Sequence, residues 1–311
     1  MPSRFVRLAR LALSGALWLS ACAAPSNAPR PEGGGVRLVA TTPLVAELVQ
    51  AVVAGVPEVT IVSLVPPGAD PHDYEATPAD ARSLAQASLV VGIGVGYEAG
   101  WLTGMLKAAG NPPFLALTDG LPLRRVLSET PDQMAHPDPH IWMDPKTWAE
   151  AGRGLARQLK PFLSTHTVAL DRNSEQLATS LLALDAELKE MVAALPTARR
   201  ALVTSHDALG YYADRYGFTV VGAVIPSAST EAAPTARQTA ALVALIRQHD
   251  VRAIFVEVGV NAQLVEAVAR EAGVRVAEPL VVDTLTPAGG LAPTYAALLR
   301  YDTRVIVEAL R

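Results

Sequence analysis

The chain has 311 residues, 50% of them hydrophobic and 18% charged, with a net charge of −4 at pH 7 and a single cysteine. This length is sufficient for about two domains, and the apolar content excludes a disordered chain. The acidic balance provides no surplus of positive charge for a nucleic-acid backbone. One cysteine excludes a disulfide framework and any cysteine-rich metal cluster within the chain.

The N-terminal segment has the pattern of an export signal. A basic start precedes the apolar stretch 11–19, which is too short to span a membrane as a helix. Residues 19–22 (Leu-Ser-Ala-Cys) resemble the lipobox of bacterial lipoproteins, in which cleavage leaves the cysteine as a lipidated N-terminus. We therefore predict a lipoprotein signal peptide over residues 1–21, lipidation of Cys22 and a flexible Pro- and Gly-rich tether over residues 22–35. The alternative is an ordinary signal peptide with an incidental cysteine.

Strand-like and helical segments alternate from residue 36. Short apolar or β-branched runs predict strands at 37–41, 59–65, 89–93 and 114–117, and helical patterns follow at 43–54, from 78, at 101–109 and at 145–159. Thr42, Thr77 and Asp144 each stand directly before a proline, which is typical of a helix N-cap followed by Pro at the first helical position. This alternation predicts a largely parallel sheet covered by helices on both faces.

Residues 165–195 differ from the rest because apolar residues recur at three- and four-residue steps without an interrupting Pro or Gly. At about 1.5 Å per residue they predict a helix of roughly 40 Å, long enough to cross between two lobes. The alternation then resumes, with predicted strands at 201–204, 218–224, 253–258 and 274–280 and predicted helices at 208–216, 236–249, 262–272 and 293–310.

The fold class that follows is α/β, with two lobes that each contain a mainly parallel sheet flanked by helices. We predict an N-terminal lobe over residues 36–163, one long rigid linker helix over 164–196 and a C-terminal lobe over 197–311. Because a helix without Pro or Gly resists bending, we expect a ligand held between the lobes to exchange through loop movement, either before His140 or within 281–291, rather than through a wide hinge closure.

Three of the six histidines lie where strands end or a capped helix begins: His72, His140 and His206. Asp283 follows the apolar run 274–282. The carboxyl ends of strands form the ligand crevice of an open α/β sheet, and three imidazoles with one carboxylate are a suitable donor set for zinc. The alternative is that each histidine is a loop residue hydrogen-bonded to the backbone, and the spacing alone leaves both readings open.

His136 is four residues from His140, but Pro137 and Pro139 exclude a helix that would align the two rings. It is therefore expected to be a loop residue or an auxiliary metal contact. The other two histidines fall in helical stretches beside polar residues, where we expect them to be exposed.

Two further patterns match other functions weakly. Residues 94–99 follow a strand and fit G-x-G-x-x-A, with Asp119 at the position of a ribose-binding acid, which is the outline of a dinucleotide fingerprint. The alternative there is a tight turn. Residues 205–207 (Ser-His-Asp) contain the residue types of a catalytic triad, but neighbours in sequence cannot present a relay to one another.

Several motifs together resemble one family, the zinc/manganese-specific solute-binding lipoproteins of ABC importers. The matching segments lie in the expected order, at 66–80, 138–145, 205–218, 229–234, 255–257 and 282–285. The Gly94 loop fits the same family pattern through Glu98, Trp101 and Leu102, which removes the need for a dinucleotide. The resemblance extends over about residues 36 to 311.

The resemblance implies two lobes with the metal between them. It places His72 and His140 in the N-terminal lobe and His206 and Asp283 in the C-terminal lobe as the metal ligands. Zn²⁺ is the expected transported ion and Mn²⁺ the next candidate, because the third position is His rather than Glu and zinc prefers the extra nitrogen.

The implied function is capture of the metal outside the cytoplasm and its delivery to a membrane permease, without enzymatic activity. The expected partners are the ABC permease with its ATPase and, through the lipid anchor, the cell membrane; the protein is expected to be a periplasmic or lipid-anchored monomer that binds no nucleic acid. The alternative from another class is an exported zinc-dependent hydrolase, in which water replaces Asp283 and Glu231 or Glu257 serves as general base.

Overall fold

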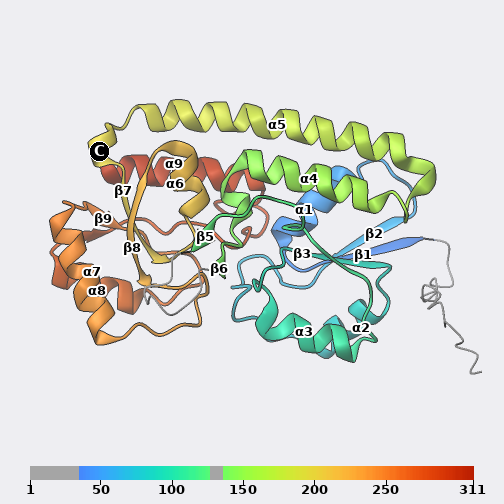
Figure 1. Cartoon of the computed structure of the whole chain (residues 1–311), viewed down its shortest axis with the longest axis horizontal. Helices are drawn as coiled ribbons and strands as arrows, with labels where there is room; N and C mark the ends of the chain where they lie inside the picture. The colour runs from blue at the N-terminus through green and yellow to red at the C-terminus, as the bar shows by residue number, and fades with distance from the viewer. Residues whose placement is uncertain (1–34, 127–135) are drawn as a thin grey trace, which may run out of the picture.

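The computed structural model describes residues 35–126 and 136–311. The predicted signal peptide, Cys22 and all of the tether except Gly35 lie outside these residues. Figure 1 shows two α/β lobes, with the long helix α5 (Thr167–Ala193) lying along both of them. Within the described ranges, no helix combines the length and the apolar character needed to cross a bilayer.

The first lobe contains a four-stranded, fully parallel sheet in the order β2-β1-β3-β4. Its strands are β1 (Val36–Ala40), β2 (Val59–Ser63), β3 (Leu89–Gly92) and β4 (Phe114–Ala116). Alternate residues of β1 point to opposite faces: Leu38 packs toward α1 (Pro43–Val52) and α4 (Pro145–Leu159), whereas Val39 packs toward α2 (Pro78–Ala85) and α3 (Ala99–Ala108). The predicted parallel sheet with helices on both faces is confirmed.

The three predicted helix N-caps form as the sequence indicates. The Thr42 side chain accepts a hydrogen bond from Val45 N, and the Asp144 carboxylate accepts from two backbone N–H groups of the first turn of α4. Thr77 and Asp80 cap α2 reciprocally, because each side chain accepts from the other's backbone N–H. These caps fix the points at which the chain turns from each loop into its helix.

The second lobe is built from two parallel strand pairs, β7 (Ala201–His206) with β8 (Thr219–Ile225) and β9 (Ala253–Ile254) with β10 (Arg275–Val276). A parallel bridge between Thr204 and Phe255 joins the pairs. Helices α6 (Gly210–Tyr216), α7 (Ala236–Gln248), α8 (Ala262–Ala272) and α9 (Tyr295–Leu310) surround them. The strand expected over 274–280 is only two residues long, since Pro279 cannot donate a ladder hydrogen bond and pairing resumes only as a bridge at Leu280.

Helix α5 is more than a connection between the lobes. It packs on α4 of the first lobe and on α9 of the second, and one continuous hydrophobic core beneath it contains residues of both lobes. Exposed ion pairs flank these contacts, from Arg153 to Glu175 and from Arg300 to Glu187. The predicted long helix is confirmed, with short 3-10 turns η2 (Ser164–His166) and η3 (Thr197–Arg199) just outside its ends.

Two small elements near the lobe boundary have no counterpart in the sequence prediction. Strands β5 (Arg125–Val126) and β6 (His136–Pro137) form an antiparallel pair, and a 3-10 turn, η1 (Ile141–Met143), follows His140. The three side chains of η1 are buried, and all of them belong to the shared core. They place the His140 segment against the second lobe.

Candidate metal centre

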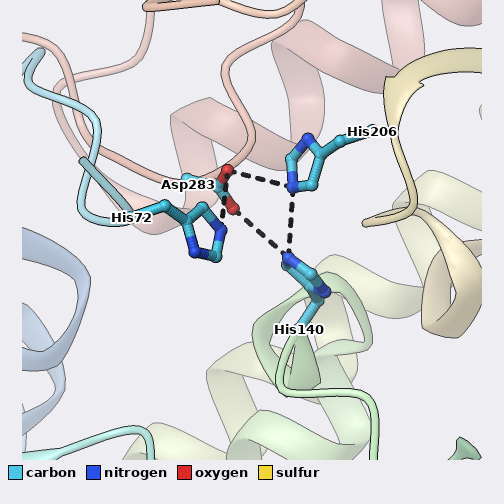
Figure 2. Close-up of side chains that lie close together, drawn as sticks. All are labelled: His72, His140, His206 and Asp283. Atoms are coloured by element: carbon cyan, nitrogen blue, oxygen red, sulfur yellow. Dashed lines mark hydrogen bonds and ion pairs between the residues drawn. The ribbon is translucent and has the colours of Figure 1, made fainter. Parts of the chain in front are cut away.

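Four side chains that are far apart in sequence converge between the two lobes (Figure 2). His72 lies in the loop after β2, His140 directly before η1, His206 at the last position of β7 and Asp283 in the segment after β10. Each offers one ligand atom, and these four atoms all lie within 4.8 Å of one another. The structure thus brings together all four sequence-predicted ligands.

The separations between these atoms suit a tetrahedral ion. The Nε2 atom of His206 lies 3.3 Å from Nε2 of His140 and 3.3 Å from Asp283 Oδ2. The other two carboxylate distances, to Nε2 of His140 and Nε2 of His72, are both 3.7 Å. Four zinc bonds of 2.0–2.1 Å in a tetrahedron place the ligand atoms about 3.3 Å apart, so the present residues fit zinc after small adjustments.

Burial distinguishes this group from a chance surface cluster. His140 and His206 are fully inaccessible, and His72 and Asp283 are 5% and 9% exposed. Within residues 35–126 and 136–311, this is the one group of three or more His, Cys, Asp or Glu side chains arranged closely enough to hold a metal. Buried polar groups need partners. Because the Nε2 atoms and the carboxylate face one another, a metal ion or protons must lie between them.

Each imidazole has a second partner that turns its Nε2 atom inward. Nδ1 of His140 donates to Asp138 Oδ1 over 2.8 Å, and Nδ1 of His206 lies 2.5 Å from Glu257 Oε2. The His72 ring is hydrogen-bonded to the backbone of Tyr97. Such partners fix the tautomer and orientation of a metal-binding histidine. Sequence reasoning missed this role of Asp138 and Glu257, although the Asp-Pro-His spacing of residues 138–140 was a local signal for the first.

Burial and neighbouring charges shift the pKa of His72, His206 and Asp283. Burial, together with the other imidazoles, lowers the pKa of His72 to about 2. Burial also disfavours charge on His206, but the charges of Glu257 and Asp283 outweigh it and raise the pKa of His206 to about 10. Burial raises the pKa of Asp283 to about 6, against the opposing effect of His206. The metal-free centre at neutral pH therefore holds a proton on His206, which an incoming metal must displace.

The remaining sequence candidates lie elsewhere or serve other purposes. His136 is exposed on β6 and is not part of the four-residue group. In the Gly94 turn, the buried Glu98 carboxylate accepts from Ile93 N and Gly94 N, so the chain's own acid occupies the donors that a pyrophosphate would need. The hydrolase alternative needs Glu257 as a free base, but this carboxylate is engaged by His206, and Glu231 is exposed.

Comparisons with known proteins show which family the chain resembles. The sequence profile of the ZnuA family, described as "Zinc-uptake complex component A periplasmic", matches residues 38–309. The chain is 31% identical over 278 residues to the zinc-binding protein TroA of Treponema pallidum (strain Nichols), with 88% of each chain covered. It is 28% identical over 281 residues to the manganese-binding lipoprotein MntA of Bacillus subtilis (strain 168), covering 89% of this chain and 90% of that protein.

Solved structures show the same architecture. The periplasmic zinc-binding protein TroA from Treponema pallidum superposes with a TM-score of 0.78 at 29% identity, covering 89% of this chain and 99% of that one. A manganese-bound periplasmic metal-binding protein from Candidatus Liberibacter asiaticus gives the same TM-score at 23% identity, over 89% of this chain and 100% of that one, and supports the fold alone. On the extent of the profile match, the chain belongs to the ZnuA family of periplasmic zinc-uptake components.

Proposed function

We propose that this chain is the extracytoplasmic substrate-binding component of a metal ABC importer and that its cargo is Zn²⁺, bound by His72, His140, His206 and Asp283. One observation carries the assignment of these ligands. Their four ligand atoms are buried, come from both lobes and lie within 4.8 Å of one another, and four of the distances between them, at 3.3–3.7 Å, are close to those of a tetrahedral zinc site. An ion bound there contacts both lobes at once.

Zinc is favoured over manganese by the chemistry of the donor set. Three imidazole nitrogens and one carboxylate suit borderline-soft Zn²⁺, whereas Mn²⁺ prefers more oxygen ligands. The two relatives named above divide on this point, one described as zinc-binding and the other as manganese-binding. Manganese therefore remains the second candidate, and direct competition between the ions decides between them.

The site is suited to transport rather than catalysis. Catalytic zinc keeps an open position for water beside a general base, whereas here four protein ligands are available and the nearest acid, Glu257, is bound to His206. Members of this family are solute-binding transport proteins, and the hydrolase alternative has no support in the comparisons.

The protein works with a membrane permease and its ATPase, outside the cytoplasm, as the family implies. We propose further that Cys22 carries the lipid anchor, that residues 22–35 form the tether, and that the mature protein is a monomer. The proposed lobe boundaries are 36–163 and 197–311, with the helical connection over 164–196. The lipoprotein names of relatives such as MntA support the anchor.

Metal titration of ligand variants tests the assignment. The protein purified without chelator is analysed for metal, and Zn²⁺ and Mn²⁺ are then competed for it. His140→Ala and His206→Ala are each expected to weaken zinc binding by more than about 100-fold, since each removes a direct bond to the ion. His249→Ala, at the exposed C-terminal end of α7, is the control and leaves affinity unchanged. Unaltered titrations for both ligand variants would overturn the site.

A further inference from the structure

The segment that carries Asp283 belongs to the second lobe in sequence but is bonded to the first. The indole Nε1 of Trp142 donates to Val282 O over 2.9 Å, and the phenol of Tyr97 donates to Asp283 O over 3.3 Å. Gly68 N donates to Leu285 O over 2.8 Å. All three donors come from the first lobe, and they reach three carbonyls within four residues.

The aromatic donors also contact the two histidines of the first lobe. The Tyr97 ring meets His72 edge-on, with 4.7 Å between ring centroids, and Trp142 meets His140 in the same way at 5.2 Å. The two aromatic rings contact each other at 5.1 Å. Both are buried, with Tyr97 4% exposed and Trp142 inaccessible. Tyr97 and Trp142 thus connect the Asp283 backbone to His72 and His140 through one packed unit.

His206 is held differently. It ends β7, and both its ring Nδ1 and its backbone N–H contact Glu257, which also belongs to the second lobe. The backbone hydrogen bond of the Asp283 segment to its own lobe lies just upstream, where Val281 N donates to the buried Asp302 Oδ1 over 2.8 Å, and the Asp283 carboxylate itself lies 3.3 Å from His206 Nε2. Along residues 281–285, backbone hydrogen bonds to the second lobe therefore end at residue 281, and those to the first lobe begin at residue 282.

We propose that Tyr97 and Trp142 are positioning residues that fix Asp283 against His72 and His140, so that these three ligands form one half-site on the first lobe. His206 is then the ligand that separates when the metal is exchanged. This inference rests on the proposed function. It departs from the loop movement expected from the sequence, because His206 lies on strand β7 and therefore moves with the second lobe. The start of the 281–291 loop is bonded to the first lobe, which raises the cost of opening it.

The physical effect of the two donors is preorganisation. Without the Tyr97 hydroxyl, the buried Asp283 carbonyl loses a donor and the segment samples positions outside coordinating distance. A metal must then restore the order of the segment as it binds, which weakens binding, and the carboxylate leaves more readily, which speeds release. A lost neutral hydrogen bond corresponds to about a five- to tenfold change, expected chiefly in the zinc dissociation rate.

The test compares Tyr97→Phe with a matched variant, Tyr301→Phe. Tyr301 also donates its hydroxyl to a backbone carbonyl near this segment, that of Pro279 over 3.0 Å, but both groups lie in the second lobe. Zinc release into excess chelator is followed by stopped flow, and hydrogen exchange of residues 281–286 is followed in the metal-free proteins. Trp142→Phe, which keeps an aromatic ring and removes the indole N–H, is measured in parallel.

Tyr97→Phe is expected to release zinc about five- to tenfold faster than Tyr301→Phe and to exchange faster at residues 281–286, with a metal-free melting temperature equal to that of the control. Equal release rates and equal exchange in the two variants would overturn the inference. The exchange readout needs no metal. If the wild-type protein binds no zinc, the proposed function fails, while exchange at 281–286 still decides whether Tyr97 positions the segment.

Discussion

The Nε2 atoms of His140 and His206 lie 3.3 Å apart, although one histidine belongs to the first lobe and the other to the second. Two lone pairs at this distance would repel, so one of the nitrogens carries a proton in the metal-free protein. The raised pKa of His206 assigns this proton to it, because the Glu257 and Asp283 carboxylates outweigh the effect of burial. In the metal-free protein, a hydrogen bond from His206 Nε2 to His140 Nε2 therefore joins the two lobes at the position where the metal binds.

Zinc binding is expected to release a proton at neutral pH. The pKa of His206 in the folded protein, about 10, is above its usual value of 6.5, so the proton is retained and competes with zinc throughout this window. Affinity should therefore rise about tenfold per pH unit from 6.5 to 9 and fall more steeply below about 6, where Asp283 also becomes protonated. Calorimetry in buffers of different ionisation enthalpy measures the released proton, and a pH-independent affinity would contradict this account.

Glu257→Gln should weaken zinc binding by about 10- to 100-fold, because the charge that supports the His206 imidazole is lost while its shape is kept. The same variant should flatten the pH dependence above 7, since the pKa of His206 falls without the carboxylate. Glu231→Gln changes an exposed acid and is the control. Equal affinities for the two variants, measured by chelator competition, would show that Glu257 does not support the site.

Zinc should stabilise the folded protein, because the site is assembled only when both lobes are in place. At a free zinc concentration 100 times the dissociation constant, the expected gain is about 2.7 kcal/mol, seen as a melting temperature several degrees higher. The gain should disappear in His206→Ala and persist in His249→Ala. A zinc-dependent shift that survives in His206→Ala would place the stabilising ion elsewhere.

Helix α5 is held to the second lobe by a half-buried charge cluster. Asp185 on α5 accepts from Arg215 and from Lys189, and Arg215 also lies 3.3 Å from Asp144. Burial raises the pKa of Asp185, but the two cations outweigh this and lower it. Its contribution to stability is therefore complete above its usual pKa of 3.8 and is lost as the pH falls through the lower folded value.

Arg215→Ala should accordingly cost about 1–3 kcal/mol of unfolding free energy at pH 7, since it leaves a buried carboxylate short of a partner. Arg153→Ala breaks the exposed pair with Glu175 on the other half of α5 and should cost less than Arg215→Ala, because water screens an exposed ion pair. Urea unfolding of the metal-free proteins compares them. Equal losses would show that the Asp185 cluster is no more important than a surface pair.

Much of the fold could be predicted from the sequence because its signals are local, whereas the set of four candidate ligands came from the family resemblance, since their spacing alone left two interpretations open. The Thr-Pro and Asp-Pro caps mark helix starts. His206 and Asp283 directly follow apolar runs and His72 follows one through the loop 66–71, so a parallel sheet brings them to one edge. The parts that could not be predicted depend on contacts between distant residues. Glu257 is 51 residues from His206, and Tyr97 is 186 residues from Asp283. The shortened β10 depends on Pro279 within an otherwise strand-like run.

The coordination of zinc in the loaded protein tests the central claim most directly. X-ray absorption at the zinc edge, combined with the His140→Ala and His206→Ala variants, reports the number and type of atoms around the ion. The account predicts four ligands at about 2.0–2.1 Å, three of them imidazole nitrogens and one a carboxylate oxygen, with one imidazole lost in each variant. A coordination shell of five or six mainly oxygen atoms would contradict this site. A shell that is the same in the wild-type protein and in both variants would also contradict it.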